Sequence, residues 1–567
     1  MLHTLMPILA QVDAAPLATP GNWTIPLLVL IPVIGALLTL VLTPKDNPKQ
    51  ACILALIISL APLAIVIMMA AQFSRIAVAE GDVAVSGWHY QFAYNWIPAF
   101  GIKFLMGVDA ISLWLLVLTA VLTPISILAS YNYIKERQPE FYAWMLILHA
   151  AMLGVFCARD ILVFYLFFEF TLIPMFFIIG IWGGAERRKA AGKFFLFTFA
   201  GSVFTLVSLL YISYLNFKAN GVMSFAMDDL YRFGQTPGAI SPHVQTLLFF
   251  GLLAGFAVKV PLFPVHTWLP LAHTEAPTAG SVILAGVLLK LGTYGLLRFL
   301  VPVLPYATQT YAPVIATICV IGIIYGALVS WVQGDMKKLI AYSSVSHLGF
   351  CVLGLFAMTP EGVMGSVLYM INHGLSTGAL FLIVGMIYER YHTRDMDQLS
   401  GLVRRTPALA FFAVFFVLSS IALPGLNGFV SEFLVLLGTF VSGRTVDGVR
   451  MGTLGPAYAI PAATGVILGA VYLLYWTGRV VFGPLKEPVH ETADDDHGHH
   501  HHVPDLSGRE WAVLLPVAVL VLIMGVYPIK VMNSLRAPID GLVKSVNQPP
   551  MLDTGMKTAD ASVTLKE

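Results

Sequence analysis

Apolar runs of about 20 residues, the length that a helix needs to cross a bilayer, recur along the whole chain. We find about 14 of them, and they lie near residues 23–43, 51–72, 110–131, 141–158, 160–182, 193–216, 244–272, 276–300, 312–333, 338–358, 363–389, 406–440, 456–482 and 511–533. Only 11% of the residues are charged, whereas soluble domains carry about 25%. The sequence therefore predicts an all-α polytopic membrane protein.

The composition also limits what the chain can bind. The formal net charge is +1, so nothing indicates a nucleic-acid partner. Cys52, Cys157, Cys319 and Cys351 all lie in apolar runs and far apart in sequence, which favours small buried residues over a metal site or a disulfide framework. Because no GxGxxG, Walker A or CxxC motif occurs, we expect no cofactor and no metal in this chain.

The distribution of Lys and Arg between alternate loops predicts the orientation. One set of loops, which includes Lys337 and Lys338 as expected inner-face anchors, holds about twice as many of these cations as the other set, which includes Arg159 and Arg298. The positive-inside rule places the richer set in the cytoplasm. With an even number of spans, both termini lie on the outer side of a bacterial cytoplasmic membrane, in contact with lipid.

Four regions are expected from these spans. They are residues 1–109, with two spans and an outer segment, residues 110–302 and 303–483, with one half of the bundle each, and residues 484–567, with a His-rich inner loop, the last span and a polar tail. The stretch VAVSGWHYQFAYNW, residues 83–96, is rich in Val and aromatic residues and predicts a short hairpin or an interfacial loop. The run DDDHGHHHHV, residues 494–503, favours a solvated loop over a transition-metal site.

Six ionisable residues remain inside the predicted spans after the loops are removed. They are Glu169, Lys259, Lys290, His347, His373 and Glu432. A Lys or Asp at the centre of a membrane helix costs about 2.5–3.5 kcal/mol on insertion scales, so such groups are functional candidates by default. The alternative is a structural pair for Glu169, and an ordinary interhelical hydrogen bond for His347 or His373.

The two lysines are predicted to share a depth in the membrane. Each lies about 15 residues from the turn near residues 274–277, or roughly 22 Å along its helix. Their ammonium groups would repel one another, and Glu169, about nine residues into the fifth span, has a similar depth. A carboxylate there could hold Lys259 charged, and its withdrawal would release the proton. These residues predict a proton switch.

Prolines interrupt two spans next to an ionisable residue. Pro261 follows Lys259 in the seventh span, and Pro424 precedes Glu432 in the twelfth. Non-helical backbone at membrane depth is tolerated where it lines protein or a water cavity. Broken helices in two related halves are typical of an ion path, so we expect two inverted five-helix repeats, spans four to eight and nine to thirteen, although the two sequences do not visibly repeat.

Three stretches resemble the antiporter-like membrane subunits of respiratory complex I. They are KVPLFPVHTWLPLAHTEAPTAGSVILAGVLLKLGTYGLLR (residues 259–298), DMKKLIAYSSVSHLGF (residues 335–350) and LPGLNGFVSEFLVL (residues 423–436). The resemblance covers about residues 100–480. It implies sister antiporter-like chains as partners and one pumped proton, driven by NADH oxidation and quinone reduction in other subunits.

The resemblance also implies a role for individual residues. Glu169 would pair with Lys259, Lys290 would connect the two halves, His347 would relay the proton, and Glu432 would be the terminal residue on the exit side. In one of the three chains of this type the terminal residue is a Glu and in the two sisters a Lys, so Glu432 indicates the glutamate branch.

Other functions stay open from the sequence. The first alternative is a subunit of a multisubunit Na⁺/H⁺ antiporter, which shares the ancestry and a similar set of charges. The second is an inert structural scaffold whose charges only pair, and the third is a solute transporter. Genomic neighbours and tightly bound partner chains would distinguish them.

Overall fold

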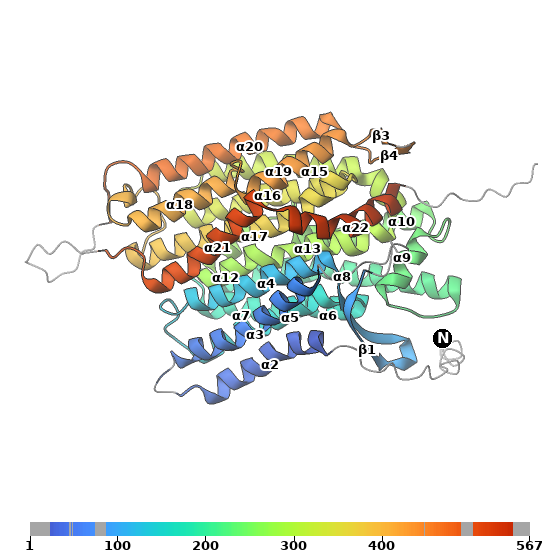
Figure 1. Ribbon diagram of the computed structural model, residues 1–567, viewed down its shortest axis with the longest axis horizontal. Helices are drawn as coiled ribbons and strands as arrows, with labels where there is room; N and C mark the ends of the chain where they lie inside the picture. The colour runs from blue at the N-terminus through green and yellow to red at the C-terminus, as the bar shows by residue number, and fades with distance from the viewer. Residues whose placement is uncertain are drawn as a thin grey trace, which may run out of the picture.

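The computed structural model describes residues 23–44, 47, 49–73, 87–446, 448–488 and 503–547, and Figure 1 shows a long bundle of helices. Its first part consists of α2 (Thr24–Leu42), α3 (Gln50–Phe73), β1 (His89–Ile97), η1 (Pro98–Phe100), β2 (Ile102–Val108), α4 (Ala110–Ala129), α5 (Gln138–Cys157), α6 (Ile161–Phe170), α7 (Leu172–Trp182), α8 (Arg187–Asn220), α9 (Met227–Gln235), α10 (Pro242–Lys259) and α11 (Leu269–Glu275). One continuous helical run follows, made of α12 (Thr278–Ile283), η2 (Leu284–Leu288), α13 (Leu289–Gly295), η3 (Leu296–Leu300) and α14 (Val301–Val303). The rest comprises α15 (Pro305–Trp331), α16 (Met336–Phe356), α17 (Pro360–Tyr391), η4 (Leu402–Arg404), α18 (Pro407–Ser420), α19 (Asn427–Val441), β3 (Thr445–Val446), β4 (Val449–Arg450), α20 (Pro456–Trp476), η5 (Thr477–Val481), α21 (Gly508–Val526) and α22 (Ile529–Asn547).

The helix count agrees with the sequence. Within the described residues, 13 helices are long and apolar enough to cross a membrane. The remaining predicted span, residues 406–440, consists of the two shorter apolar helices α18 and α19. The prediction of an all-α polytopic membrane protein is confirmed, whereas the inverted repeats stay a prediction.

Polar side chains at helix starts set several helix boundaries. Asp109, Asp160, Asp335 and Thr359 each accept a hydrogen bond from a backbone N–H in the first turn of the helix that follows, α4, α6, α16 and α17. Ser507 forms a capping box at the start of α21. These groups satisfy donors that a helix start would otherwise leave unpaired, which costs more near lipid than in water.

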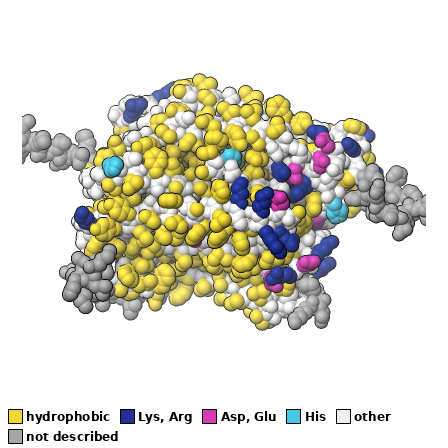
Figure 2. Space-filling model, turned by 180° about the vertical axis from the view of Figure 1, so that it is seen from behind, with side chains coloured by type: hydrophobic (Ala, Val, Ile, Leu, Met, Phe, Trp, Pro, Cys, Tyr) yellow, Lys and Arg dark blue, Asp and Glu magenta, His cyan; other side chains and the backbone are white. Residues whose placement is uncertain are grey.

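Three spans form the centre of the bundle. The run from Thr278 to Val303 and helix α17 are buried throughout their most apolar windows, and α16 is nearly so. The peripheral spans α3 and α20 bury only a third of theirs. Figure 2 shows the outcome on one face, where apolar side chains cover the middle and most of the visible charged side chains gather toward one end. The three central spans are therefore shielded from lipid, and polar residues on them face protein.

The backbone departs from regular α-helix near the predicted site residues. Helix α10 ends at Lys259 and α11 begins at Leu269. In the gap, the Trp268 indole donates to the Val258 carbonyl at 2.9 Å, and Lys193 Nζ donates to the Thr267 carbonyl at 2.8 Å, so carbonyl groups freed by the break have partners. The π-helical segments η2 and η3 flank α13, and a gap also separates α18 from α19.

A two-stranded hairpin marks one end of the molecule. Strands β1 and β2 pair antiparallel, with Phe92 opposite Met106, and together with α9 they lie at the right of Figure 1. We call this end the hairpin end; α21 begins at the opposite end. The strands extend beyond the predicted stretch of residues 83–96, because its partner strand is residues 102–108, while residues 83–86 lie outside the described residues.

The predicted polar tail after the last span is wrong in part, because residues 529–547 form helix α22. Its buried side chains recur every three or four residues and are Val531, Leu535, Ile539, Val543 and Val546, and they face α4, α15 and α17. Exposed charged residues between them lower the mean hydropathy, so a search for apolar runs misses an amphipathic helix. The remaining tail residues 548–567, the polar N-terminal residues 1–22 and the His-rich residues 494–502 lie outside the described residues.

Candidate functional site

Four of the six predicted site residues meet at the centre of the bundle. Lys290 lies on α13, His347 on α16, His373 on α17 and Glu432 on α19. Their exposed fractions are 0%, 6%, 4% and 5% respectively. Buried ionisable groups at membrane depth need partners, so their contacts decide what they can do.

Lys290 and His373 are in direct contact. Lys290 Nζ lies 2.7 Å from His373 Nδ1 and also donates to the carbonyl of Ala285 in η2. A charged Lys290 ammonium would donate to Nδ1 of a neutral His373 that carries its hydrogen on Nε2, whereas a neutral Lys290 amine could accept from a protonated Nδ1. His373 Nε2 is buried and has no hydrogen-bond partner among the described residues. The pair can therefore pass a proton from nitrogen to nitrogen.

His347 and Glu432 are bridged by a tyrosine that the sequence analysis missed. The Tyr369 hydroxyl donates to Glu432 Oε1 at 2.5 Å, and its oxygen lies 2.7 Å from His347 Nδ1. The Tyr472 hydroxyl lies 3.4 Å from His347 Nε2 on the other side of the ring. Tyr369 lies four residues before His373 on α17, one turn away on the same helix face, which is the only signal that could have singled it out.

A small polar cavity lies between these two groups. Its free volume for water centres is about 20 Å³, and its lining comprises His347, Tyr369, Asn372, His373, Ser376, Thr377, Ser419, Ser420, Gly428, Ser431 and Glu432. A cavity needs about 10–15 Å³ to hold one water, together with polar partners. The His347 and His373 rings are 5.7 Å apart between centroids, and no direct hydrogen bond joins them among the described residues. One bridging water would connect them.

The gap between α18 and α19 contributes to the same network. Asn427, the first residue of α19, accepts through Oδ1 from Ser419 at 2.6 Å and from Ser376 at 3.2 Å. Its backbone carbonyl accepts from the Asn372 amide at 2.7 Å. These bonds join the ends of the interrupted span to α17 and hold Glu432, one turn further along, against the cavity.

Lys259 and Glu169 lie outside this central group of four. Lys259 is 3% exposed, and its ammonium lies 3.4 Å from the Thr171 hydroxyl and 4.6 Å from the centre of the Phe168 ring. Both carboxylate oxygens of half-buried Glu169 have no hydrogen-bond partner among the described residues. No direct salt bridge joins Glu169 and Lys259 among the described residues, and Thr171, at the interruption between α6 and α7, contacts the ammonium. The two charges still interact electrostatically, so the predicted pairing stays a prediction.

Two further buried ionisable residues were not among the predicted site residues. His273 on α11 is fully buried, has two ring nitrogens without partners among the described residues, and stacks on Phe381 of α17 at 4.6 Å. Lys337, expected to be an inner-face anchor, is 7% exposed and donates through Nζ to the Ala276 carbonyl. Both lie beside the chain segment 273–276 that joins α11 to the central run, so they extend the polar groups toward the end opposite the hairpin.

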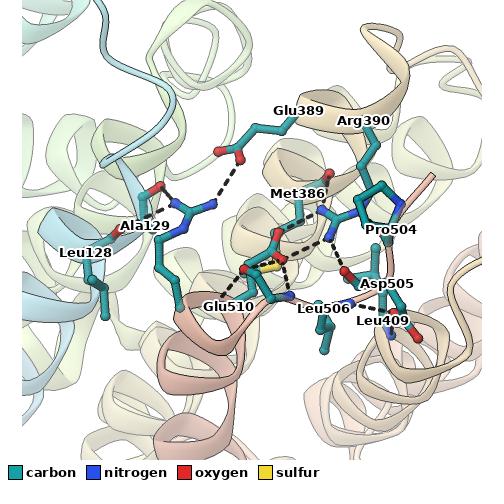
Figure 3. Close-up of polar contacts among 12 residues, drawn as sticks. Leu128, Ala129, Met386, Glu389, Arg390, Leu409, Pro504, Asp505, Leu506 and Glu510 are labelled. Carbon is teal, nitrogen blue, oxygen red and sulfur yellow. Dashed lines mark hydrogen bonds and ion pairs between the residues drawn. The ribbon is translucent and has the colours of Figure 1, made fainter. Parts of the chain in front are cut away.

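A network of ion pairs at that opposite end ties the last span to the centre (Figure 3). The guanidinium of Arg390, on α17, binds both carboxylate oxygens of Glu510 at 2.7 and 2.9 Å and the carbonyls of Pro504 and Asp505. The carboxylate of Asp505 in turn accepts from two backbone N–H groups at the start of α18. Arg509 binds Glu389 of α17 at 3.1 Å and the carbonyl of Ala129 at the end of α4.

A conservative change at the bridging tyrosine tests this geometry. In Tyr369→Phe the ring stays and only the hydroxyl is lost, so His347 and Glu432 are left 3.7 Å apart without their bridge. If a proton crosses from His347 to Glu432 through that hydroxyl, proton transport by the assembled protein falls about tenfold. The amount of assembled protein stays unchanged. Proton uptake by vesicles, normalised to protein on a native gel, measures the transport; a matched Tyr306→Phe change of a half-exposed tyrosine should leave it unaltered.

Comparison with known proteins identifies the class. Residues 158–448 match the family model described as NADH:quinone oxidoreductase/Mrp antiporter membrane region, and residues 51–156 match the amino terminus of NADH-ubiquinone oxidoreductase chain 4. The chain belongs to this family of antiporter-like membrane subunits.

Similar proteins indicate the branch of the family to which the chain belongs. NADH-quinone oxidoreductase subunit M of Rhodobacter capsulatus is 43% identical over 476 residues, 83% of this chain and 88% of that one. NADH-ubiquinone oxidoreductase chain 4 of Marchantia polymorpha is 40% identical over 520 residues, 91% and 96% of the two chains. A chain of respiratory complex I from Thermus thermophilus superposes with a TM-score of 0.78 at 28% identity, covering 92% and 99%. The chain belongs with subunit M and chain 4, the branch that Glu432 indicated.

Proposed function

We propose that this chain is a proton-translocating membrane subunit of an NADH:quinone oxidoreductase and works beside sister antiporter-like subunits. One observation carries the proposal: Lys290, His373, the polar cavity, His347, Tyr369 and Glu432 form one row of proton-exchanging groups across the three most buried spans and α19. Each neighbour in this row is within hydrogen-bond reach or separated by the space of one water. A structural scaffold would need no such row.

The individual roles follow from this order. Protons enter from the cytoplasm, the end opposite the hairpin, near α10–α11 and the central run, are held by Lys259 and Lys290, and pass through His373 and His347 to Glu432. Glu169 acts on Lys259 at a distance, and the gaps in the two broken spans supply polar backbone to the path. Redox chemistry stays in other subunits, whose state would set the charge of the lysines. In a bacterial cytoplasmic membrane, the hairpin end and both termini would face outward.

The runner-up is a subunit of a multisubunit Na⁺/H⁺ antiporter, because the matching family model covers both kinds of protein. The central contact argues against Na⁺ as the moving ion. Hard cations bind through several oxygen ligands, whereas Lys290 Nζ and His373 Nδ1 form a nitrogen–nitrogen contact that suits a proton. Pumping should therefore be independent of added Na⁺, and the chain should co-purify with flavin and iron–sulfur subunits.

Glu432→Gln tests the proposed path. The amide keeps the size and can still accept from Tyr369, but it cannot bind or release a proton. We expect NADH-driven acidification of proteoliposomes that contain the whole complex to fall about tenfold, with Glu432→Asp retaining most of it. Unchanged pumping in the Gln variant, with normal assembly, would remove Glu432 from the path.

A further inference from the structure

The helix that carries Lys290 continues toward the hairpin end and reaches a buried cation there. Tyr294 lies four residues beyond Lys290 and Arg298 eight residues beyond, which corresponds to about one and two turns on one helix face. Arg298 was predicted to be a loop cation. The structure instead places it in η3, where only 7% of the residue is exposed.

Hydroxyl groups connect Tyr294 to this arginine. The Tyr294 hydroxyl lies 2.9 Å from Ser112 Oγ, and Ser112 Oγ accepts from Arg298 Nη2 at 3.2 Å. Arg298 Nη2 also forms an ion pair with Asp109, whose carboxylate caps α4 by accepting from the Ser112 backbone N–H at 2.9 Å. A short polar line therefore starts at Tyr294, one turn beyond Lys290, runs toward the hairpin end and stops at an ion pair.

The hairpin end covers that pair with a second one. The Arg298 guanidinium lies 5.2 Å from the Trp88 ring and 5.0 Å from the Tyr294 ring. Arg159 lies 5.0 Å from the same Trp88 ring and is ion-paired with Asp228. Side-chain exposure rises from 9% for both members of the inner pair to 14% and 15% for the outer one, so the inner pair is the more deeply buried of the two.

The chemistry of the inner pair, Arg298 and Asp109, suits a group that blocks protons better than one that passes them on. An arginine side chain stays protonated in proteins, so it cannot accept the proton that a relay has to pass on. A fixed positive charge in a narrow polar passage repels protons and other cations. Stabilisation of the fold explains the Arg298–Asp109 pair poorly, since buried ion pairs often stabilise a protein no more than apolar residues of similar volume do.

We propose that Arg298, held in place by Asp109, is an electrostatic barrier that seals the hairpin end of the first half of this subunit. A proton on Lys290 then has one way out, through His373 and the second half of the bundle. The inference rests on the proposed proton-translocating function, and it adds that the subunit prevents protons from returning directly to Lys290.

The test measures passive proton leak in proteoliposomes of the whole complex, with no NADH present and a K⁺ diffusion potential applied. The Arg298→Met change nearly keeps the side-chain volume and removes the positive charge. We expect the passive proton leak to rise about tenfold. Asp228→Asn removes only the outer pair and should stay as tight as the parent complex. The double variant of Arg298→Met and Asp109→Asn leaves no uncompensated charge at the inner pair. A purely structural ion pair predicts that this double variant is tight, which would overturn the proposal, whereas loss of the barrier predicts a leak like that of Arg298→Met.

A second double variant shows whether the leak passes through the central site. If Arg298→Met opens a way to Lys290, adding Lys290→Met closes it again, and this second double variant is tight. If it leaks as strongly as Arg298→Met, the result contradicts a barrier in front of Lys290, and so does a tight Arg298→Met vesicle. The proposed function fails by a different observation, namely normal NADH-driven pumping in Glu432→Gln, so the two failures are distinguishable.

Discussion

In Lys259→Ala, NADH-driven proton pumping by the assembled complex is expected to fall about 100-fold, with coupled turnover falling alongside it, because a proton-exchanging group at a positioned site typically contributes 10²–10⁴-fold. Lys259 is buried at the end of α10, where the helix has a gap before α11. Its contacts are a threonine hydroxyl and an aromatic ring, and the described residues place no carboxylate within ion-pair distance. A cation held this way is free to exchange its proton, and Ala removes the exchange.

The control for this prediction is Lys218→Ala. Lys218 is an exposed lysine in the last turn of α8, so its loss should change neither pumping nor assembly. The amount of assembled complex on a native gel separates a pumping defect from a folding defect. Intact pumping in Lys259→Ala would support the inert scaffold and contradict the proposed path.

In Arg390→Met the complex is expected to assemble poorly, because removal of one partner of a buried ion pair costs about 3–5 kcal/mol. The side chains of Arg390 and Glu510 are 8% and 4% exposed. The lost guanidinium leaves the Glu510 carboxylate without its positive partner and the Pro504 and Asp505 carbonyls without their donor. These bonds join α17 to α21 and, through Asp505, to the start of α18 (Figure 3). Thermal unfolding in detergent and the yield of assembled complex measure the effect.

Two further variants locate the cause of that loss. Arg232→Met removes an exposed pair with Asp229 and should cost under about 1 kcal/mol. The double variant of Arg390→Met and Glu510→Gln leaves no uncompensated charge and should recover part of the stability. If Arg390→Met and Arg232→Met unfold at the same temperature, the network in Figure 3 does not stabilise the bundle.

Sequence reasoning found the groups that needed an explanation but not the contacts between them. Lys290, His347, His373 and Glu432 stood out because charge is costly in an apolar run. Tyr369 did not stand out, since a tyrosine in a membrane helix is ordinary, and only the packing of α16, α17 and α19 makes it a bridge. The same applies to Arg298, which charge counting assigned to a loop although Asp109, 189 residues away, holds it inside.

The sequence by itself determined the membrane-spanning class, the spans, the two interruptions with their prolines and the family, because hydropathy, proline chemistry and long motifs are local properties of the chain. Only the tertiary structure decided that Lys290 contacts His373, that Lys259 contacts Thr171, and that residues 529–547 form a packed amphipathic helix. The physical reason is that hydrogen bonds reach about 3 Å, and the residues that meet across this bundle are separated by tens to hundreds of positions in the chain.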